Sequence, residues 1–184
     1  MVALVGRSAP HVESVSSRFD EVFRSNYARL YSLVYRLLGD RGEAEDTLQE
    51  VFLKAVGEPV IHRADHEVSA WLRRACLNAG YNRLRSQVRQ LRYTERAGRL
   101  DFAARPDDQG PLLDVLRREQ QDAVRRALRA LPERQRTCLL LRHSGYSYAE
   151  IAATLGMALG SVGVLLARGE QTFKDAYQAQ EGTP

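Results

Sequence analysis

The chain has 184 residues, a formal net charge of +4 and 44% hydrophobic residues, and it contains only two cysteines. Cys76 and Cys138 lie far apart in the sequence, which argues against a disulfide framework and favours a reducing compartment. The sequence has no run of eighteen apolar residues and its N-terminus lacks a signal-peptide layout. We therefore expect a soluble cytoplasmic protein without membrane insertion.

Nearly every segment has helical periodicity, and none has the sustained alternation of a strand. The sequence therefore predicts an all-α fold of two small helical domains joined by a flexible linker, the C-terminal one containing a helix-turn-helix. The expected domains cover residues 18–97 and 114–178, with a linker at 98–113. A mobile extension at 1–17 and a tail at 179–184 are expected to flank them.

The first predicted helix begins near Phe19 and stops at Gly39, because glycine readily adopts the left-handed conformation that ends a helix. Asp40 then caps a second helix, with Glu43 in capping-box register. The buried stripe of this second helix is predicted to consist of Ala44, Leu48, Val51, Phe52 and Ala55.

The opposite face of the second helix holds Asp46, Gln49, Glu50 and Leu53 together. A solvated acidic face is the simplest interpretation of such a pattern. Leu53, an apolar residue amid the acidic group, favours a protein-docking surface instead. Both interpretations stay open from the pattern alone.

A polar connector between Val60 and Val68 contains His62 and His66, four residues apart. On a helix this spacing could hold a metal, but no third or fourth ligand lies at a suitable offset. We expect a solvated loop here, and neither a metal nor a cofactor in the protein.

Helical periodicity resumes at Ser69 and changes phase along the next helix. Its first apolar residues share one phase: Trp71, Leu72, Ala75 and Cys76. The later ones share a shifted phase: Leu77, Tyr81, Leu84, Val88 and Leu91. The slip falls near residues 78–80 and predicts a bend or a junction there.

This helix is rich in arginines, with eight arginines and one acidic residue between Ala70 and Arg99. Five of them form a stripe if the helix persists: Arg85, Arg89, Arg92, Arg96 and Arg99. Guanidinium groups beside aromatic rings favour phosphate contacts and stacking of unpaired bases. The alternative is a solvated surface with Trp71 in the core; we favour nucleic acid for the stripe and the core for Trp71.

After the acidic linker, a second helical lobe leads into the segment YAEIAATLGMALGSVGVLL at residues 148–166. Ala152 suits a close helix crossing and Gly156 suits a tight turn. Ser147 is a predicted N-cap with Glu150 in capping-box register. These features favour a helix-turn-helix, the commonest device for laying a helix in the major groove, although an ordinary helical hairpin would share the apolar spacing.

Three segments resemble, in order and spacing, the two conserved regions of the extracytoplasmic function (ECF) sigma factors of bacterial RNA polymerase. They are GDRGEAEDTLQEVFLKA, SAWLRRACLNAGYNRLR and LRALPERQRTCLLLRHSGYSYAEIAATLGMALGSV. The resemblance implies an alternative-type sigma factor, not an enzyme, that binds core RNA polymerase, recognises promoter DNA as duplex and as melted non-template strand, and helps to open the strands. It also implies an anti-sigma factor as a further partner.

The resemblance also assigns roles to residues. The polymerase-binding set is Asp46, Gln49, Glu50 and Leu53. The set for the minus-ten element is Trp71, Arg73, Arg74, Asn78, Tyr81, Asn82, Arg83 and Arg85, in which Asn78 occupies the position that reads a flipped base. The set for the minus-35 element is Tyr148, Gly160, Ser161, Val164 and Arg168.

The predicted recognition helix departs from the family pattern, because Gly163, Val164, Leu165 and Ala167 stand where the family is usually basic or polar. Recognition of duplex DNA would then depend on the shape of the DNA and on contacts to its phosphate backbone, or this lobe would bind a protein instead. The alternative function is a stand-alone helix-turn-helix transcriptional regulator. An enzyme is disfavoured, since the sequence has no Gly-rich phosphate loop, nucleophile motif or metal cluster.

Overall fold

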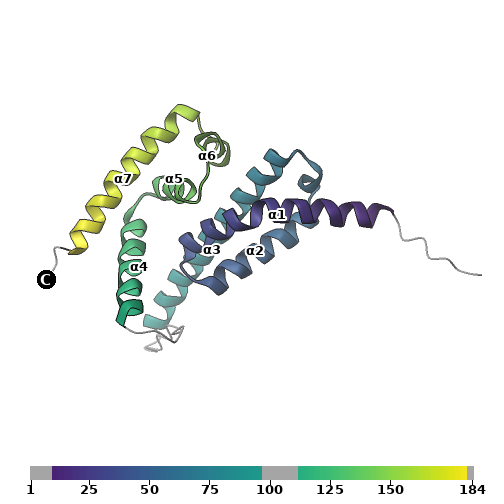
Figure 1. The fold of residues 1–184 in the computed structure, drawn as a ribbon. Helices are drawn as coiled ribbons and strands as arrows, with labels where there is room; N and C mark the ends of the chain where they lie inside the picture. Colours follow the sequence, from purple (N-terminus) through teal and green to yellow (C-terminus); the bar gives the residue numbers. More distant parts are fainter. Residues whose placement is uncertain (1–9, 97–111, 182–184) are drawn as a thin grey trace, which may run out of the picture.

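The computed structural model describes residues 10–96 and 112–181, which form seven α-helices and one short 3-10 helix. The N-terminal lobe consists of α1 (Pro10–Leu38), α2 (Arg41–Val56), η1 (Pro59–His62) and α3 (Asp65–Arg96). The C-terminal lobe consists of α4 (Leu112–Ala130), α5 (Glu133–His143), α6 (Tyr148–Leu155) and α7 (Leu159–Glu181). The described residues contain no strand, so the predicted all-α fold is confirmed (Figure 1).

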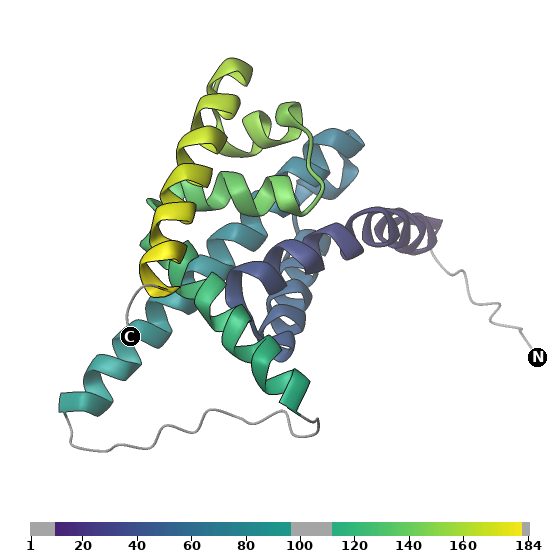
Figure 2. The ribbon, with the colours of Figure 1, turned by 60° about the vertical axis from the view of Figure 1, so that its left-hand side comes forward.

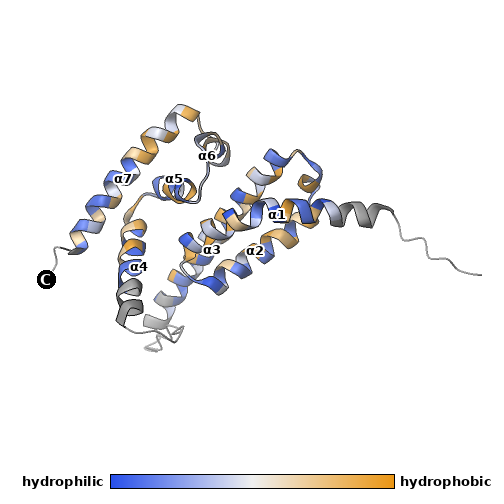
Figure 3. Ribbon diagram, viewed as in Figure 1, coloured by the Kyte–Doolittle hydropathy of each residue, from blue (hydrophilic) through white to orange (hydrophobic). Residues whose placement is uncertain are grey.

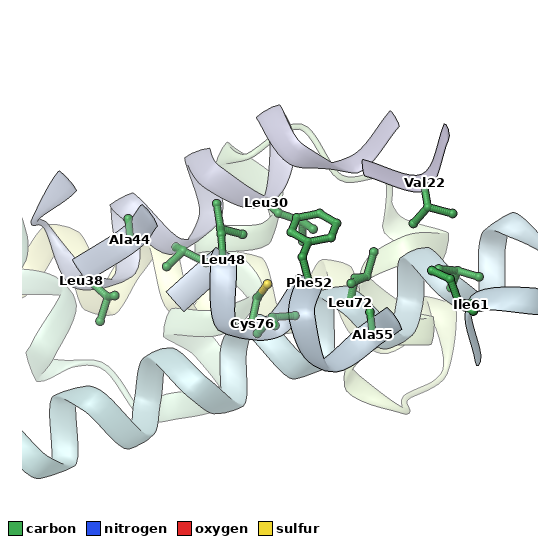
Figure 4. Close-up of a cluster of buried hydrophobic side chains, with 13 residues drawn as sticks. Val22, Leu30, Leu38, Ala44, Leu48, Phe52, Ala55, Ile61, Leu72 and Cys76 are labelled. Atoms are coloured by element: carbon green, nitrogen blue, oxygen red, sulfur yellow. The ribbon is translucent and has the colours of Figure 1, made fainter. Parts of the chain in front are cut away.

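The first core fills the space between α1, α2 and α3, where side chains from the three helices meet (Figure 4). Leu30 of α1, Leu48 and Phe52 of α2, and Leu72 of α3 are all buried there. The predicted buried stripe of α2 is confirmed in full. Each such large apolar side chain contributes about 1.5–3 kcal/mol when it is fully buried.

The predicted helix ends and turns are confirmed at three places. Gly39 follows α1 with φ +80°, and Asp40 caps α2 by accepting a hydrogen bond from the backbone N–H of Glu43 at 2.8 Å. Ser147 and Glu150 form the complete capping box at the start of α6. Gly156 ends α6 with φ +62°, the left-handed turn that a helix-turn-helix requires.

The helix α3 runs from Asp65 to Arg96 as one element, so the expected alternative of a junction between two helices near residues 78–80 is wrong. The slip has another cause. Leu72 and Cys76 face the first core, whereas Leu77 and Tyr81 face a second core made largely by the C-terminal lobe. One helix therefore serves two cores, and its apolar phase shifts where the partner changes.

Two boundaries differ from the sequence expectation. The connector between Val60 and Val68 is not simply a solvated loop, because residues 59–62 form η1 and Ile61 is 1% exposed in the first core. The first helix begins at Pro10 and not near Phe19. Most of the expected linker at 98–113 and the end of the tail at 182–184 lie outside the described residues.

The second core joins the two lobes. Leu141, Ile151 and Val162 of the C-terminal lobe pack in one cluster with Leu33 of α1 and Tyr81 of α3. Viewed from the side, α5 and α6 lie beside α1 and α3 (Figure 2), and residue pairs of α3 with α6 and of α1 with α5 are in contact. The lobes are thus packed against each other in this structure.

No single helix among the described residues is long and apolar enough to span a membrane. The α6–α7 pair passes such a test only together, as two helices bent by 94°. Polar residues interrupt the apolar ones along α7 (Figure 3).

Candidate protein-docking and nucleic-acid surfaces

The acidic face of α2 is accessible. Asp46, Gln49, Glu50 and Leu53 are all exposed, and the Leu53 residue is 67% exposed. The helix turns these four side chains outward because Leu48, Val51 and Phe52 occupy the first core. We call the four residues the α2 patch.

One edge of the α2 patch is bonded to α3. Arg83 donates hydrogen bonds to Glu50 at 2.5 Å and to Glu43 at 3.3 Å. Partial burial disfavours the charged guanidinium, but the two carboxylates outweigh this effect and raise the pKa of Arg83 above its ordinary value. Arg83 therefore lies between the predicted docking surface and the predicted DNA surface.

The eight residues predicted for the minus-ten element differ in accessibility. Arg74, Asn78, Asn82 and Arg85 are exposed along α3. Trp71 is half-buried, packs against the first core as expected, and lines a groove of about 410 Å³ between α3 and α6. Arg83 is half-buried as well.

Arg73 and Tyr81, the remaining two, are buried against the C-terminal lobe. Arg73 is 3% exposed and donates from Nε to the Thr154 hydroxyl of α6 at 2.8 Å. Tyr81 is 6% exposed, and its hydroxyl shares a hydrogen bond of 2.6 Å with the Thr137 hydroxyl of α5. Burial lowers the pKa of Arg73 below its ordinary value, and the nearby Glu150 opposes that shift.

Glu150 is the acidic centre of this contact between lobes. Arg29 of α1 donates to both of its carboxylate oxygens at 3.0 Å, and Arg73 lies 3.7 Å from the same carboxylate. Burial raises the pKa of Glu150, but hydrogen bonds from Arg29 and Ser147 outweigh it and bring the pKa to about 2. Tyr146 completes the cluster, with the guanidinium carbons of Arg29 and Arg73 at 4.0 and 5.1 Å from its ring centroid.

The residues predicted for the minus-35 element lie on the outer side of the helix-turn-helix. Gly160, Ser161, Val164 and Arg168 are exposed on α7, and Tyr148 is exposed at the start of α6. The two helices approach closely here, since a Cβ added to Gly163 would lie 3.8 Å from the Tyr148 ring. Arg142 of α5 adds a second guanidinium nearby, 5.6 Å from the centroid of the same ring.

Sequence reasoning missed four residues of the contact between lobes: Arg29, Thr137, Tyr146 and Thr154. Arg29 and Thr137 carry no motif, and their partners lie 121 and 56 residues away in the sequence. Glu150 stands out in the sequence only as part of a capping box, a local role that it does play. Nothing in that local pattern shows that its carboxylate also accepts two hydrogen bonds from α1.

Cys76 and Cys138 are free and buried, and burial raises the pKa of these thiols to about 12 and about 11. They are therefore poor nucleophiles at neutral pH. His62 and His66 are exposed, and the described part of the chain holds no cluster of three or more potential metal ligands.

Comparison with known proteins gives the class of this two-lobed chain. Sigma-70 region 2 matches residues 22–90, and Sigma-70 region 4 matches residues 121–173. The chain is 31% identical to the ECF RNA polymerase sigma factor SigE of Mycolicibacterium smegmatis, over 85% of this chain and 60% of that protein. It is 33% identical to the ECF RNA polymerase sigma factor SigM of Mycobacterium tuberculosis, over 84% of this chain and 74% of that protein.

A solved structure shares the fold: the sigma factor RpoE in complex with the anti-sigma factor NepR from Bartonella quintana, with a TM-score of 0.57 and 23% identity. The likeness covers 90% of this chain and 98% of that chain. Taken together, the two matched regions and the relatives place the chain among the sigma-70 proteins. Within them it belongs to the ECF sigma factors, alternative initiation subunits that bind core RNA polymerase and promoter DNA.

Proposed function

We propose that the chain binds core RNA polymerase through the α2 patch, opens the minus-ten element with α3 and contacts the minus-35 element with α6 and α7. It acts by binding alone and carries out no chemistry of its own. The observation that carries the proposal is the exposure of Leu53 among Asp46, Gln49 and Glu50. An exposed leucine ringed by acidic and polar groups suits a basic and apolar partner surface better than bulk water.

Strand opening without fuel requires that contacts to the melted strand offset the cost of unstacking, roughly a few kcal/mol per extruded base. Asn78 is exposed on α3 and presents an amide that can both donate and accept hydrogen bonds to a base edge. Arg74 and Arg85, also exposed, lie on the same helix and would contact the phosphate backbone.

In this proposal α7, the predicted recognition helix, contributes less to base recognition than α3 does. Among its exposed residues, Ser161 and Arg168 suit phosphate contacts, whereas Gly160 and Val164 offer no side-chain hydrogen bond. The region 4 lobe would then set the position of the protein on duplex DNA through shape and backbone contacts.

An anti-sigma factor stays a predicted further partner, supported by the Bartonella structure, in which a sigma factor of the same fold is in complex with the anti-sigma factor NepR. We also propose a cytoplasmic location, which the two free and buried cysteines support.

Run-off transcription with purified protein and core RNA polymerase tests the proposal, on a genomic fragment library and on premelted templates. Transcripts that depend on the added protein are the expected result. A stand-alone helix-turn-helix regulator would instead shift duplex DNA without polymerase and support no transcript, and that pair of results would overturn the proposal.

A further inference from the structure

The outward face of α7 is apolar at its centre. Val164 is 52% exposed, and Ala167 follows three residues later and is exposed as well. On the opposite side of the same helix, Val162 and Leu166 lie in the second core, so the outward direction of Val164 is fixed by packing. The two apolar side chains therefore face away from the lobe and are available to a partner.

This face has little capacity for hydrogen bonds to base edges. Among the exposed residues of α7 from 159 to 168, only Ser161 and Arg168 have side chains that can form hydrogen bonds. Recognition of guanine or adenine by paired hydrogen bonds requires arginine, lysine, asparagine or glutamine. Val164 and Ala167, which lie between Ser161 and Arg168 in the sequence, cannot form such pairs, so the helix must recognise bases in another way if it recognises them at all.

The major groove presents one apolar group, the C5 methyl group of thymine, and apolar side chains recognise it by direct contact. Residues three apart on a helix have Cβ atoms about 5–6 Å apart. This separation exceeds one base step, which is about 3.4 Å along a strand. Val164 and Ala167 can therefore contact methyl groups of neighbouring base pairs at the same time.

The backbone of α7 can also approach the DNA closely. Gly160 lies one turn before Val164, and a Cβ added to Gly160 would meet no atom within 4 Å. No side chain at this position holds the helix away from the floor of the groove. A short side chain such as valine reaches a base only if the helix approaches in this way.

The charges at the border of this face favour DNA over a protein as its partner. Arg168 is exposed at one end, and the guanidinium carbon of Arg142 lies 5.6 Å from the centroid of the Tyr148 ring. That ring in turn would lie 3.8 Å from a Cβ added to Gly163, beside the apolar centre of the face. Guanidinium groups bind phosphates, and residues 151–169 contain no carboxylate that would repel them.

We propose that α7 recognises the minus-35 element through the C5 methyl groups of thymines, which contact Val164 and Ala167. Ser161, Arg142 and Arg168 contact the phosphate backbone and position the helix. This inference rests on the proposed function and specifies what the region 4 lobe reads in the duplex. The minus-35 element of this protein then holds thymines, on either strand, at the base pairs that face Val164 and Ala167.

The probe is a duplex library with a randomised minus-35 region and a premelted minus-ten element, taken from a promoter found by run-off transcription. Holoenzyme assembled from the full-length protein and core RNA polymerase selects from this library, and thymines should be enriched in the randomised region. A selected duplex is then compared with the same duplex in which deoxyuridine replaces the enriched thymines. This replacement removes the methyl groups and keeps every hydrogen-bonding group. Affinity should fall about fourfold for each contacted methyl group, as expected for the burial of one such group.

Val164→Ala tests whether the preference for thymine over deoxyuridine depends on this side chain. The shorter alanine loses contact with one methyl group, so the preference at one base pair should fall toward one. Val88→Ala makes the same change at a valine of α3 that is 49% exposed, and it is the matched control that should keep the preference. Both variants should stay folded, because both sites are exposed and alanine favours helices more than valine does, and urea unfolding checks this.

Equal affinity of the holoenzyme for the thymine and deoxyuridine duplexes would overturn the proposal, as would a selection that enriches no thymine. A preference that Val164→Ala leaves unchanged would also overturn it, because the shape of the DNA would then carry the preference. Weaker assembly of Val164→Ala with core polymerase, at an unchanged preference, would assign this face to a protein partner instead.

Run-off transcription with the unmodified protein separates these outcomes from failure of the proposed function. Transcripts from the premelted template without a preference for thymine remove the recognition of methyl groups alone. No transcript from any template removes the sigma-factor function itself.

Discussion

Arg83 of α3 and Glu50 of α2 form an ion pair of 2.5 Å that joins the proposed DNA surface to the proposed polymerase surface. Arg83 cannot contact the DNA backbone fully while it is paired with Glu50. A polymerase that binds Glu50 would release Arg83 from this pair. Glu50→Gln should therefore weaken binding to core polymerase while it tightens binding of single-stranded DNA to the free protein. We expect about a two- to fivefold change in each direction, as for a half-exposed pair.

Anisotropy with labelled DNA and a titration of labelled protein with core polymerase measure the two effects. Glu45→Gln, an exposed acidic residue on the same helix, is the control and should change neither. Changes of the same sign in both assays would contradict the coupling between Arg83 and Glu50.

A charge reversal in the α2 patch should leave the fold intact but weaken binding to core polymerase. Asp46→Arg places a cation where a basic partner surface is proposed, and juxtaposed like charges cost several kcal/mol, so core affinity should fall by more than about tenfold. The thermal midpoint should stay unchanged, because Asp46 is exposed. Asp20→Arg on α1 makes the same charge change outside the patch, and equal losses in the two variants would remove the docking assignment.

Asn78 is the residue proposed to read an extruded base. Asn78→Ala should reduce open-complex formation more than it reduces assembly with core polymerase, because its side chain is exposed on α3 and does not belong to the α2 patch. Permanganate footprinting of unpaired thymines measures opening, and co-elution with core measures assembly. Parallel losses in the two measurements would argue against base capture.

The turn of the helix-turn-helix depends on the backbone of one residue. Gly156 has φ +62°, and a Cβ added there would meet no atom within 4 Å, so Gly156→Ala tests backbone strain without a clash. We expect a loss of about 1–2 kcal/mol in the free energy of unfolding, the cost of a left-handed alanine. Urea unfolding measures it. Gly160→Ala, at an open helical position without positive φ, should be neutral or stabilising.

The contacts of Glu150 with Arg29 and Arg73 should be insensitive to pH in the physiological range. Burial opposes ionisation of Glu150, but Arg29 and Ser147 bring its pKa to about 2, below the ordinary value of 4.5. A carboxylate with a depressed folded-state pKa contributes stability that is present above about pH 4.5 and is lost as the pH falls toward 2. The Tyr146 hydroxyl beside it keeps its proton at neutral pH, because burial raises the pKa of Tyr146 to about 12.

Unfolding measured between about pH 8 and pH 3 checks this expectation. The difference in stability between the unmodified protein and Glu150→Gln should be constant from about pH 8 to about pH 5 and should shrink below about pH 4.5. A difference that changes between about pH 6 and 8 would show that another titrating group controls the contact.

Local patterns in the sequence determined the helical elements and their caps. The stripe from Ala44 to Ala55 follows from helical period alone, and the capping box of Ser147 and Glu150 follows from residues three apart. The outward position of Leu53 follows from the same helical period. These features involve neighbours along the chain, so each could be predicted from its own segment.

Tertiary structure alone decided what the second half of α3 packs against. The shifted apolar phase at Leu77 and Tyr81 was visible in the sequence, but a bend and a second partner predict the same shift. Likewise the partners of Glu150 come from α1 and α3, and no periodicity encodes a contact between residues 121 positions apart. A helix fixes which side chains share a face, whereas the element that covers the face depends on how the whole chain packs, and this packing buries Arg73 and Tyr81.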